Sequence, residues 1–231
     1  MKKDAVFFKF VLINCFTSSS LILPVRIVWL LHYLITIDEI STLKVILSLT
    51  ISFFEIPTGI VADLMSRRMS MAISAFLFSL HAVFYCLLPN FYGFALTQVL
   101  LGLSASFMSG ADSSYFHSYL NEKTQENSFA YVDLSSKIGL IGKIVSACYA
   151  LVSSILFNYE PRIVFGLSFV MGLIAATIIL TLPKEQRETI RFKDIKIKHF
   201  IEMPIKTWQV IIGNRNIINI ILSTAFIYSF L

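Results

Sequence analysis

The chain has 231 residues, of which 56% are hydrophobic and only 14% charged, and its mean hydropathy is +0.76. A soluble domain has about a quarter of its residues charged, so this composition excludes an ordinary soluble protein. In hydrocarbon every backbone polar group needs a partner within the protein, which leaves helices or closed barrels. The apolar runs are about twenty residues long and do not alternate, so we predict an all-α, polytopic membrane protein.

Charge, cysteine usage and motif content exclude other classes. The formal net charge of +5 is concentrated in certain loops, which is a pattern of membrane orientation and not of nucleic-acid binding. The three cysteines lie in apolar runs without disulfide or metal-ligand spacing. No zinc-hydrolase, phosphate-loop or serine-hydrolase motif occurs in the sequence. We therefore predict no enzyme activity, no cofactor and no metal.

Six complete apolar spans follow one another along residues 1–182. Each can cross a hydrocarbon core of about 30 Å at about 1.5 Å per residue. They predict a six-helix transmembrane bundle with these spans: Phe7–Ile35, Leu43–Asp63, Ser70–Leu88, Phe91–Leu120, Phe129–Leu156 and Ile163–Leu182.

The loop charges set a predicted orientation. One set of loops carries most of the basic residues, namely Lys2, Lys3, Arg67, Arg68, Lys123 and the cluster from Lys184 to Lys206. The other set carries Asp38, Glu39, and Glu160 with Arg162. Because basic loops stay on the inner side, we expect a multi-pass protein of the inner (plasma) membrane with a cytoplasmic N-terminus.

Residues 183–216 are predicted to form a cytoplasmic linker. Lysines alternate there with apolar residues at roughly helical spacing, which is typical of an amphipathic helix on the inner leaflet. Residues 217–231 begin a seventh apolar run that covers only about 22 Å, short of a full crossing. We therefore expect the chain to be a fragment that lacks a C-terminal half.

The loop after the second span carries the sequence Gly59-Ile-Val-Ala-Asp63-Leu-Met-Ser-Arg67-Arg68. This stretch resembles the loop signature of the major facilitator superfamily, which lies at the same place in the order of spans, although Ser66 stands where that family usually has glycine. The resemblance implies the N-terminal six-helix half of a transporter and the start of its seventh helix. It further implies a cytoplasmic gate in which Asp63 contacts Arg67 and a helix end from the second half. The alternative is a solvated arginine pair that ends the span.

Two acids are candidates for coupling transport to protons. Glu55 lies inside the second span, where an unpaired charge costs several kcal/mol. With Pro57-Thr-Gly it resembles a pattern of a bacterial, drug-efflux branch of the superfamily. Asp112, in Ser109-Gly110-Ala-Asp112, is the second candidate. The fifth span lacks the Gly-Pro pair of many proton-drug antiporters, which weakens the exporter assignment.

A structural role is the alternative for Glu55. Lys137 lies at a similar depth on the fifth span and could pair with it, but Asp133 precedes Lys137 by four residues and competes for the same ammonium group. The sequence leaves this choice open.

Three cations are candidates for the substrate cavity: Arg26, Lys137 and Lys143. The superfamily lines its cavity with the first, second, fourth and fifth spans, so the resemblance places them there. They would favour an anionic or carboxylate-bearing solute, or neutralise an acid of the other half. Snorkelling to the interface is the alternative, above all for Arg26.

Small residues at spacings of three or four predict close helix contacts on the fourth and fifth spans. They are Gly102, Ser106 and Gly110, and Gly139, Gly142 and Ser146.

These observations predict a secondary transporter that moves a small solute across the lipid bilayer by alternating access. We expect proton coupling and consider export of drug-like compounds. The alternative is a non-transporting, truncated or accessory membrane protein.

Overall fold

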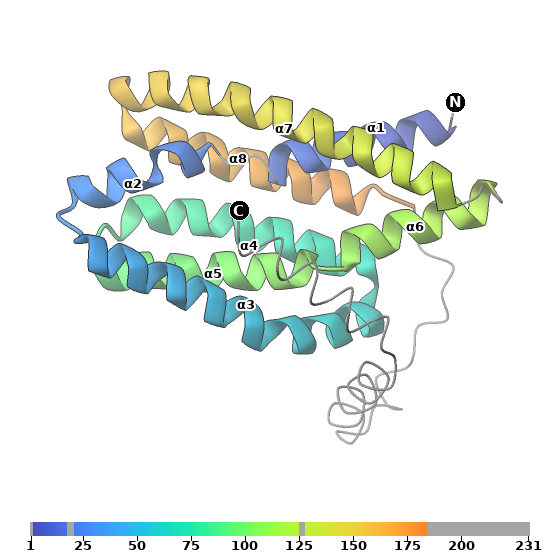
Figure 1. Ribbon diagram of the computed structural model, residues 1–231, viewed down its shortest axis with the longest axis horizontal. Helices are drawn as coiled ribbons and strands as arrows, with labels where there is room; N and C mark the ends of the chain where they lie inside the picture. Colours follow the sequence, from blue (N-terminus) through green and yellow to red (C-terminus); the bar gives the residue numbers. More distant parts are fainter. Residues whose placement is uncertain (1, 18–20, 125–127, 184–231) are drawn as a thin grey trace. The chain divides into compact units, whose positions relative to one another are not determined.

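The computed structural model describes residues 2–17, 21–124 and 128–183, so the predicted linker and seventh run lie outside the described residues. This part is helical and contains no strand (Figure 1). Its helices are α1 (Lys2–Thr17), α2 (Ile22–His32), α3 (Ile37–Met65), α4 (Arg67–Leu87), α5 (Phe91–Met108), α6 (Ala111–Thr124), α7 (Ser128–Tyr159) and α8 (Pro161–Leu180).

Among the described residues, six stretches are long and apolar enough to cross a membrane, which confirms the six spans predicted for residues 1–182. They are Val6–His32, Ile37–Ala62, Arg67–Leu87, Phe91–Tyr119, Val132–Tyr159 and Pro161–Leu180. The first span combines α1 and α2, and the fourth combines α5 and α6. We call the end of the bundle with Arg67, Arg68 and Leu182 the arginine end, and the end with Tyr33, Pro89 and Glu160 the opposite end.

The second span begins six residues earlier than predicted, at Ile37 in place of Leu43. A capping box explains the difference. The Thr36 hydroxyl accepts a hydrogen bond from the Glu39 amide at 3.3 Å, and the Glu39 carboxylate accepts one from the Thr36 amide at 2.8 Å. Asp38 and Glu39, predicted to lie in a loop, therefore lie in the first helical turn. Their negative charges are stabilising there because they interact favourably with the positive end of the helix dipole.

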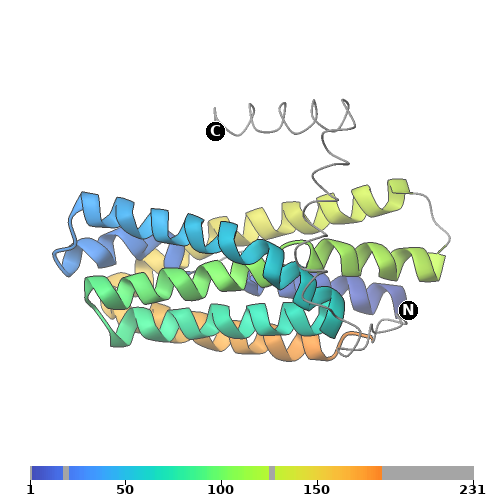
Figure 2. The ribbon, with the colours of Figure 1, turned by 90° about the horizontal axis from the view of Figure 1, so that it is seen from below.

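The contacts between helices show a pseudo-twofold pattern. When spans one, two and three are renumbered as four, five and six, and the reverse, the same pairs of spans are in contact. The third span (α4) packs along the sixth (α8). The fourth span lies against the second (α3) and third, and the first lies against the fifth (α7) and sixth (Figure 2). Nested repeats of three spans occur within each six-helix half of major facilitator transporters. The packing therefore agrees with the architecture that the loop signature implied.

Small and hydroxylated residues bring the helices together. A Cβ on Gly102 of α5 would lie 2.7 Å from Cβ of Thr50 on α3. Between α4 and α5, the Ser74 hydroxyl donates to the Ser104 carbonyl at 2.6 Å, and the Ser104 hydroxyl donates to the Ser74 carbonyl at 2.9 Å. Such contacts replace the hydrophobic driving force, which is absent between helices in lipid.

The predicted stripes of small residues are correct only in part. Gly142 on α7 faces the Asn14 side chain of α1 at very short range, as close packing requires. Gly110, in contrast, is not a packing residue. Its φ of +73° interrupts the fourth span between α5 and α6, a conformation that glycine adopts without strain. A Cβ on Gly139 would meet no described atom within 4 Å.

The contact between α4 and α8 provides a paired test of this packing. A Cβ on Gly172 would lie 2.9 Å from Cα and 3.0 Å from the backbone nitrogen of Ser79, which cannot rotate away. We expect Gly172→Ala to destabilise the protein by about 1–3 kcal/mol, the usual cost of overpacking. A Cβ on Gly166 of the same helix meets no described atom within 4 Å, so Gly166→Ala should leave stability unchanged. Thermal unfolding in detergent measures both, and equal melting temperatures would contradict the packing described.

Candidate functional site

The loop between the second and third spans is short and ordered by a cap. Helix α3 ends at Met65 and α4 begins at Arg67, so Ser66 alone separates them. The Ser66 hydroxyl accepts a hydrogen bond from the Met69 amide at 3.2 Å. A hydroxyl at this position caps the helix, which glycine cannot do through a side chain. The departure from the family pattern therefore has a local structural reason.

Arg67 binds α6, the second helix of the fourth span. Its guanidinium donates to the Ser114 carbonyl at 2.9 Å and to the Ser118 hydroxyl at 2.8 Å, both on α6. The side chain of Asp63 lies outside the described residues, so its predicted contact with Arg67 stays a prediction. A Cβ built on Gly59 meets no described atom within 4 Å. The motif thus joins α4 to α6 through Arg67.

Arg68 and Lys9 bind the end of the sixth span. The Arg68 guanidinium donates to the Leu182 carbonyl at 2.8 Å. The Lys9 ammonium donates to the carbonyl and the hydroxyl of Thr181 at 3.0 and 2.9 Å. Cations at a helix C-terminus satisfy its unpaired carbonyls and complement its dipole.

A third helix contacts the same chain segment. The Tyr115 hydroxyl of α6 donates to the Pro183 carbonyl at 2.6 Å. The end of α8 is therefore held from α1, α4 and α6 together. We call Lys9, Arg68 and Tyr115 the α8 clamp.

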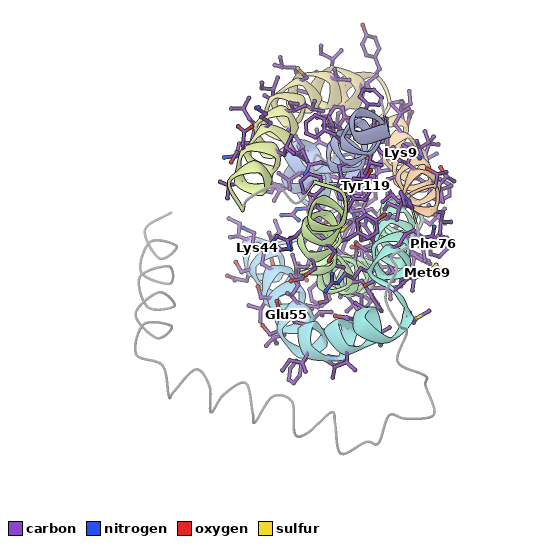
Figure 3. All side chains as sticks on the ribbon, turned by 90° about the vertical axis from the view of Figure 1, so that its right-hand side faces the viewer. Lys9, Lys44, Glu55, Met69, Phe76 and Tyr119 are labelled. Carbon is purple, nitrogen blue, oxygen red and sulfur yellow. The ribbon has the colours of Figure 1, made fainter. Side chains whose placement is uncertain are left out.

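Glu55 is exposed on α3 and lies on a different side of the bundle from Lys9 (Figure 3). Its carboxylate accepts a hydrogen bond at 3.1 Å from the hydroxyl of Ser109, the residue that ends α5. Two residues further along, Pro57 has no amide proton, so the helical bond to the Phe53 carbonyl cannot form. The acid thus lies beside two interruptions of regular helix structure.

Asp112 lies in the first turn of α6 and lines a cavity of about 220 Å³. The Ser113 amide donates to its carboxylate at 2.6 Å. The wall combines polar and apolar side chains of the first, third, fourth and fifth spans, among them Phe10, Asn14 and Phe116. Glu55 and Asp112 therefore approach the same break in the fourth span, but only Asp112 lines this cavity.

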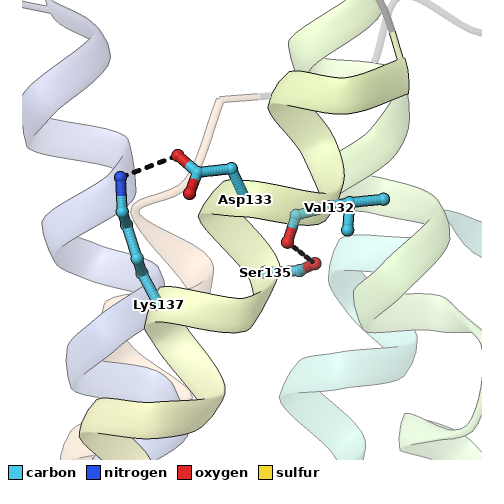
Figure 4. A network of polar contacts seen from close by, with 4 residues as sticks. All are labelled: Val132, Asp133, Ser135 and Lys137. Carbon is cyan, nitrogen blue, oxygen red and sulfur yellow. Dashed lines mark hydrogen bonds and ion pairs between the residues drawn. The ribbon is translucent and has the colours of Figure 1, made fainter.

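The choice that the sequence left open for Lys137 is decided in favour of Asp133. Their ammonium and carboxylate groups lie 2.7 Å apart on α7, one helical turn from each other (Figure 4). Both side chains are more than half exposed, so the pair adds little stability. Lys143 is exposed further along α7 and has neither a hydrogen bond nor an ion pair with any described residue.

Arg26 lines a second cavity, of about 140 Å³, near the opposite end. His81 and Tyr85 of α4 line the same cavity. Within residues 2–17, 21–124 and 128–183 Arg26 forms no hydrogen bond or ion pair. The structure thus separates Arg26 from Lys137, with which the sequence had grouped it.

Sequence reasoning missed several partners of these groups. Ser109, His81 and the α8 clamp were not predicted as partners, although Lys9 lies in an otherwise apolar run. A charged residue within such a run was the available signal for Lys9.

The fold and these polar groups define a polytopic helical membrane protein with charged and polar side chains lining cavities of its bundle. A family model described as Major Facilitator Superfamily matches residues 10–231, and the chain belongs to this superfamily of membrane transporters. No curated protein matches the chain.

Proposed function

We propose that this protein is a proton-coupled secondary transporter in which Glu55 carries the coupled proton and Asp112 is the second choice. The bundle would face a second six-helix bundle, and the solute would bind between them and be exposed alternately to each side. The N-terminus would lie in the cytoplasm and the protein in the inner membrane. For the direction of transport we propose export, with drug-like compounds as the solutes.

The observation that carries this proposal is the environment of Glu55. It lies seven residues, or about 10 Å, inside the end of its span at Ala62, yet it is exposed and its carboxylate has no cationic partner among the described residues. A carboxylate at this depth must be neutral, paired or in contact with water. A single hydroxyl donor, from Ser109, leaves it free to exchange a proton with water or with a solute.

Glu55→Gln should abolish the coupling while leaving insertion intact, because glutamine keeps the acceptor for Ser109 but cannot ionise. The assay uses everted membrane vesicles from cells that express the protein from its own gene. A dye reports collapse of an imposed pH gradient when ethidium, benzoate or chloramphenicol is added as a cationic, anionic or neutral probe.

Asp38→Asn is the matched control, since Asp38 is an exposed acid at the opposite end of the same helix. It should retain the response. A normal response from Glu55→Gln would remove Glu55 from the mechanism, and loss in Asp112→Asn alone would assign the proton to Asp112. A wild-type protein that responds to no probe would support the non-transporting alternative.

A further inference from the structure

The cavity beside Arg26 adjoins a second hollow. The first, of about 140 Å³, shares Thr17, Phe78 and Leu101 with a neighbouring hollow of about 180 Å³. An engineered apolar cavity of about 150 Å³ holds benzene, so each hollow has room for an aromatic ring or a short hydrocarbon chain. The two adjoining hollows together give the space that lies between the first span and α4 and α5.

The two ends of this space differ in charge. Arg26 supplies a guanidinium at one end, with Lys44 beside it across a narrow gap between α2 and α3. No acidic side chain lines either hollow, as far as the described lining residues go. At the other end the second hollow shares Thr17 and Met108 with the larger cavity, where Asp112 lies.

An unpaired guanidinium inside a span is costly, and Arg26 lies six residues, or about 9 Å, from the end of its span at His32. Its planar donors fit carboxylate or phosphate oxygens in pairs. The Tyr85 hydroxyl beside it is already positioned, since it accepts a hydrogen bond from the Gln98 amide at 3.2 Å. The middle of the space is largely apolar, with Phe78, Leu101 and Met108 in its wall.

From these features we propose that the protein binds an amphipathic organic anion, whose carboxylate or phosphate pairs with Arg26 and whose apolar body extends along Phe78 and Leu101 towards Met108. When Asp112 is ionised, its negative charge disfavours the reverse orientation. This assignment rests on the proposed transport function and names the class of solute at the same bundle.

The binding test uses the purified full chain in nanodiscs of phosphatidylcholine at one pH throughout. Its probes are benzoate, phenylbutyrate and phenyloctanoate, each compared with its neutral amide. We expect at least one acid to bind tenfold or more tightly than its amide, with the longer acids ahead of benzoate. Arg26→Gln should bring this ratio to about one, and Arg26→Lys should retain part of it.

Arg162→Gln is the matched control, because Arg162 is an exposed arginine at the opposite end, on α8. It should leave the ratio unchanged. Equal binding of every acid and its amide, binding of neither, or a ratio that survives in a folded Arg26→Gln variant would each overturn the assignment.

A second arm separates a bound solute from a lipid headgroup. If Arg26 pairs with the headgroup of an anionic lipid, nanodiscs that contain phosphatidylglycerol will lose all binding of the acids, and Arg26→Gln will retain less of that lipid on purification. This result would also overturn the assignment. Binding that depends on Arg26 without any solute-driven proton movement would count against the proposed transport function alone.

Discussion

Trp29→Ala should lower the stability of the bundle by about 3–5 kcal/mol, the range for removing a buried aromatic side chain. Trp29 is only 3% exposed, and its ring contacts that of Phe165 on α8 with a centroid distance of 4.9 Å. Its indole nitrogen donates to the Tyr85 carbonyl of α4 at 3.2 Å. One side chain therefore joins three spans by packing and by a hydrogen bond, and both are lost in alanine.

The loss is measured by unfolding the protein in a detergent titration. Far-ultraviolet circular dichroism follows the helix content, because a fluorescence signal would change with the removal of tryptophan. Trp29→Phe should fall between wild type and Trp29→Ala, because it keeps a ring but not the donor to Tyr85. Val28→Ala is the control on the same helix, since Val28 is 55% exposed and loses little packing. Similar losses for Val28→Ala and Trp29→Ala would mean that Trp29 is not a packing centre.

Arg68→Ala should destabilise the protein by about 1.5–3 kcal/mol, the range for hydrogen bonds to charged groups. The Leu182 carbonyl loses its donor at 2.8 Å. The C-terminus of α8 loses one of the two cations that bind it within the described part of the chain, the other being Lys9. Arg68→Lys should recover part of the loss, because it keeps the charge with different donor geometry.

Arg162 provides the comparison for this prediction, because it lies at the other end of α8. A cation is unfavourable at a helix N-terminus, so Arg162→Ala should be neutral or slightly stabilising. The test compares the melting temperatures of Arg68→Ala, Arg68→Lys and Arg162→Ala with that of the wild type in one detergent. If Arg68→Ala melts with the wild type, the α8 clamp does not stabilise the bundle and a role of Arg68 in gating alone becomes the better account.

The spans were predictable because the bilayer imposes a length and a composition on each of them. All six appear in the structure, and the largest difference from the prediction is at the start of the second span, where the capping box at Thr36 extends the helix. The interruption at Gly110 was not predicted. Glycine occurs both at close helix contacts and at positions with positive φ. The spacing of four residues between Ser106 and Gly110 therefore could not show which of these two roles Gly110 has.

Partners of the polar groups were predictable only when they were local. Asp133 and Lys137 are four residues apart, a spacing that brings side chains together on any helix. The acceptors for Arg67 and Arg68 include backbone carbonyls of Ser114 and Leu182. Every residue has such a carbonyl, so no residue type indicates which one a distant arginine will bind.

The break at Gly110 lies next to side chains that pair the backbone groups it frees. The Thr58 hydroxyl of α3 donates to the Ser106 carbonyl at 3.0 Å, and the Ser70 hydroxyl of α4 donates to the Phe107 carbonyl at 2.7 Å. Both carbonyls belong to the last turn of α5, where an ending helix leaves acceptors without amide donors, and hydrocarbon cannot supply such donors. The second and third spans thus make an interruption of the fourth span compatible with its place inside a bilayer.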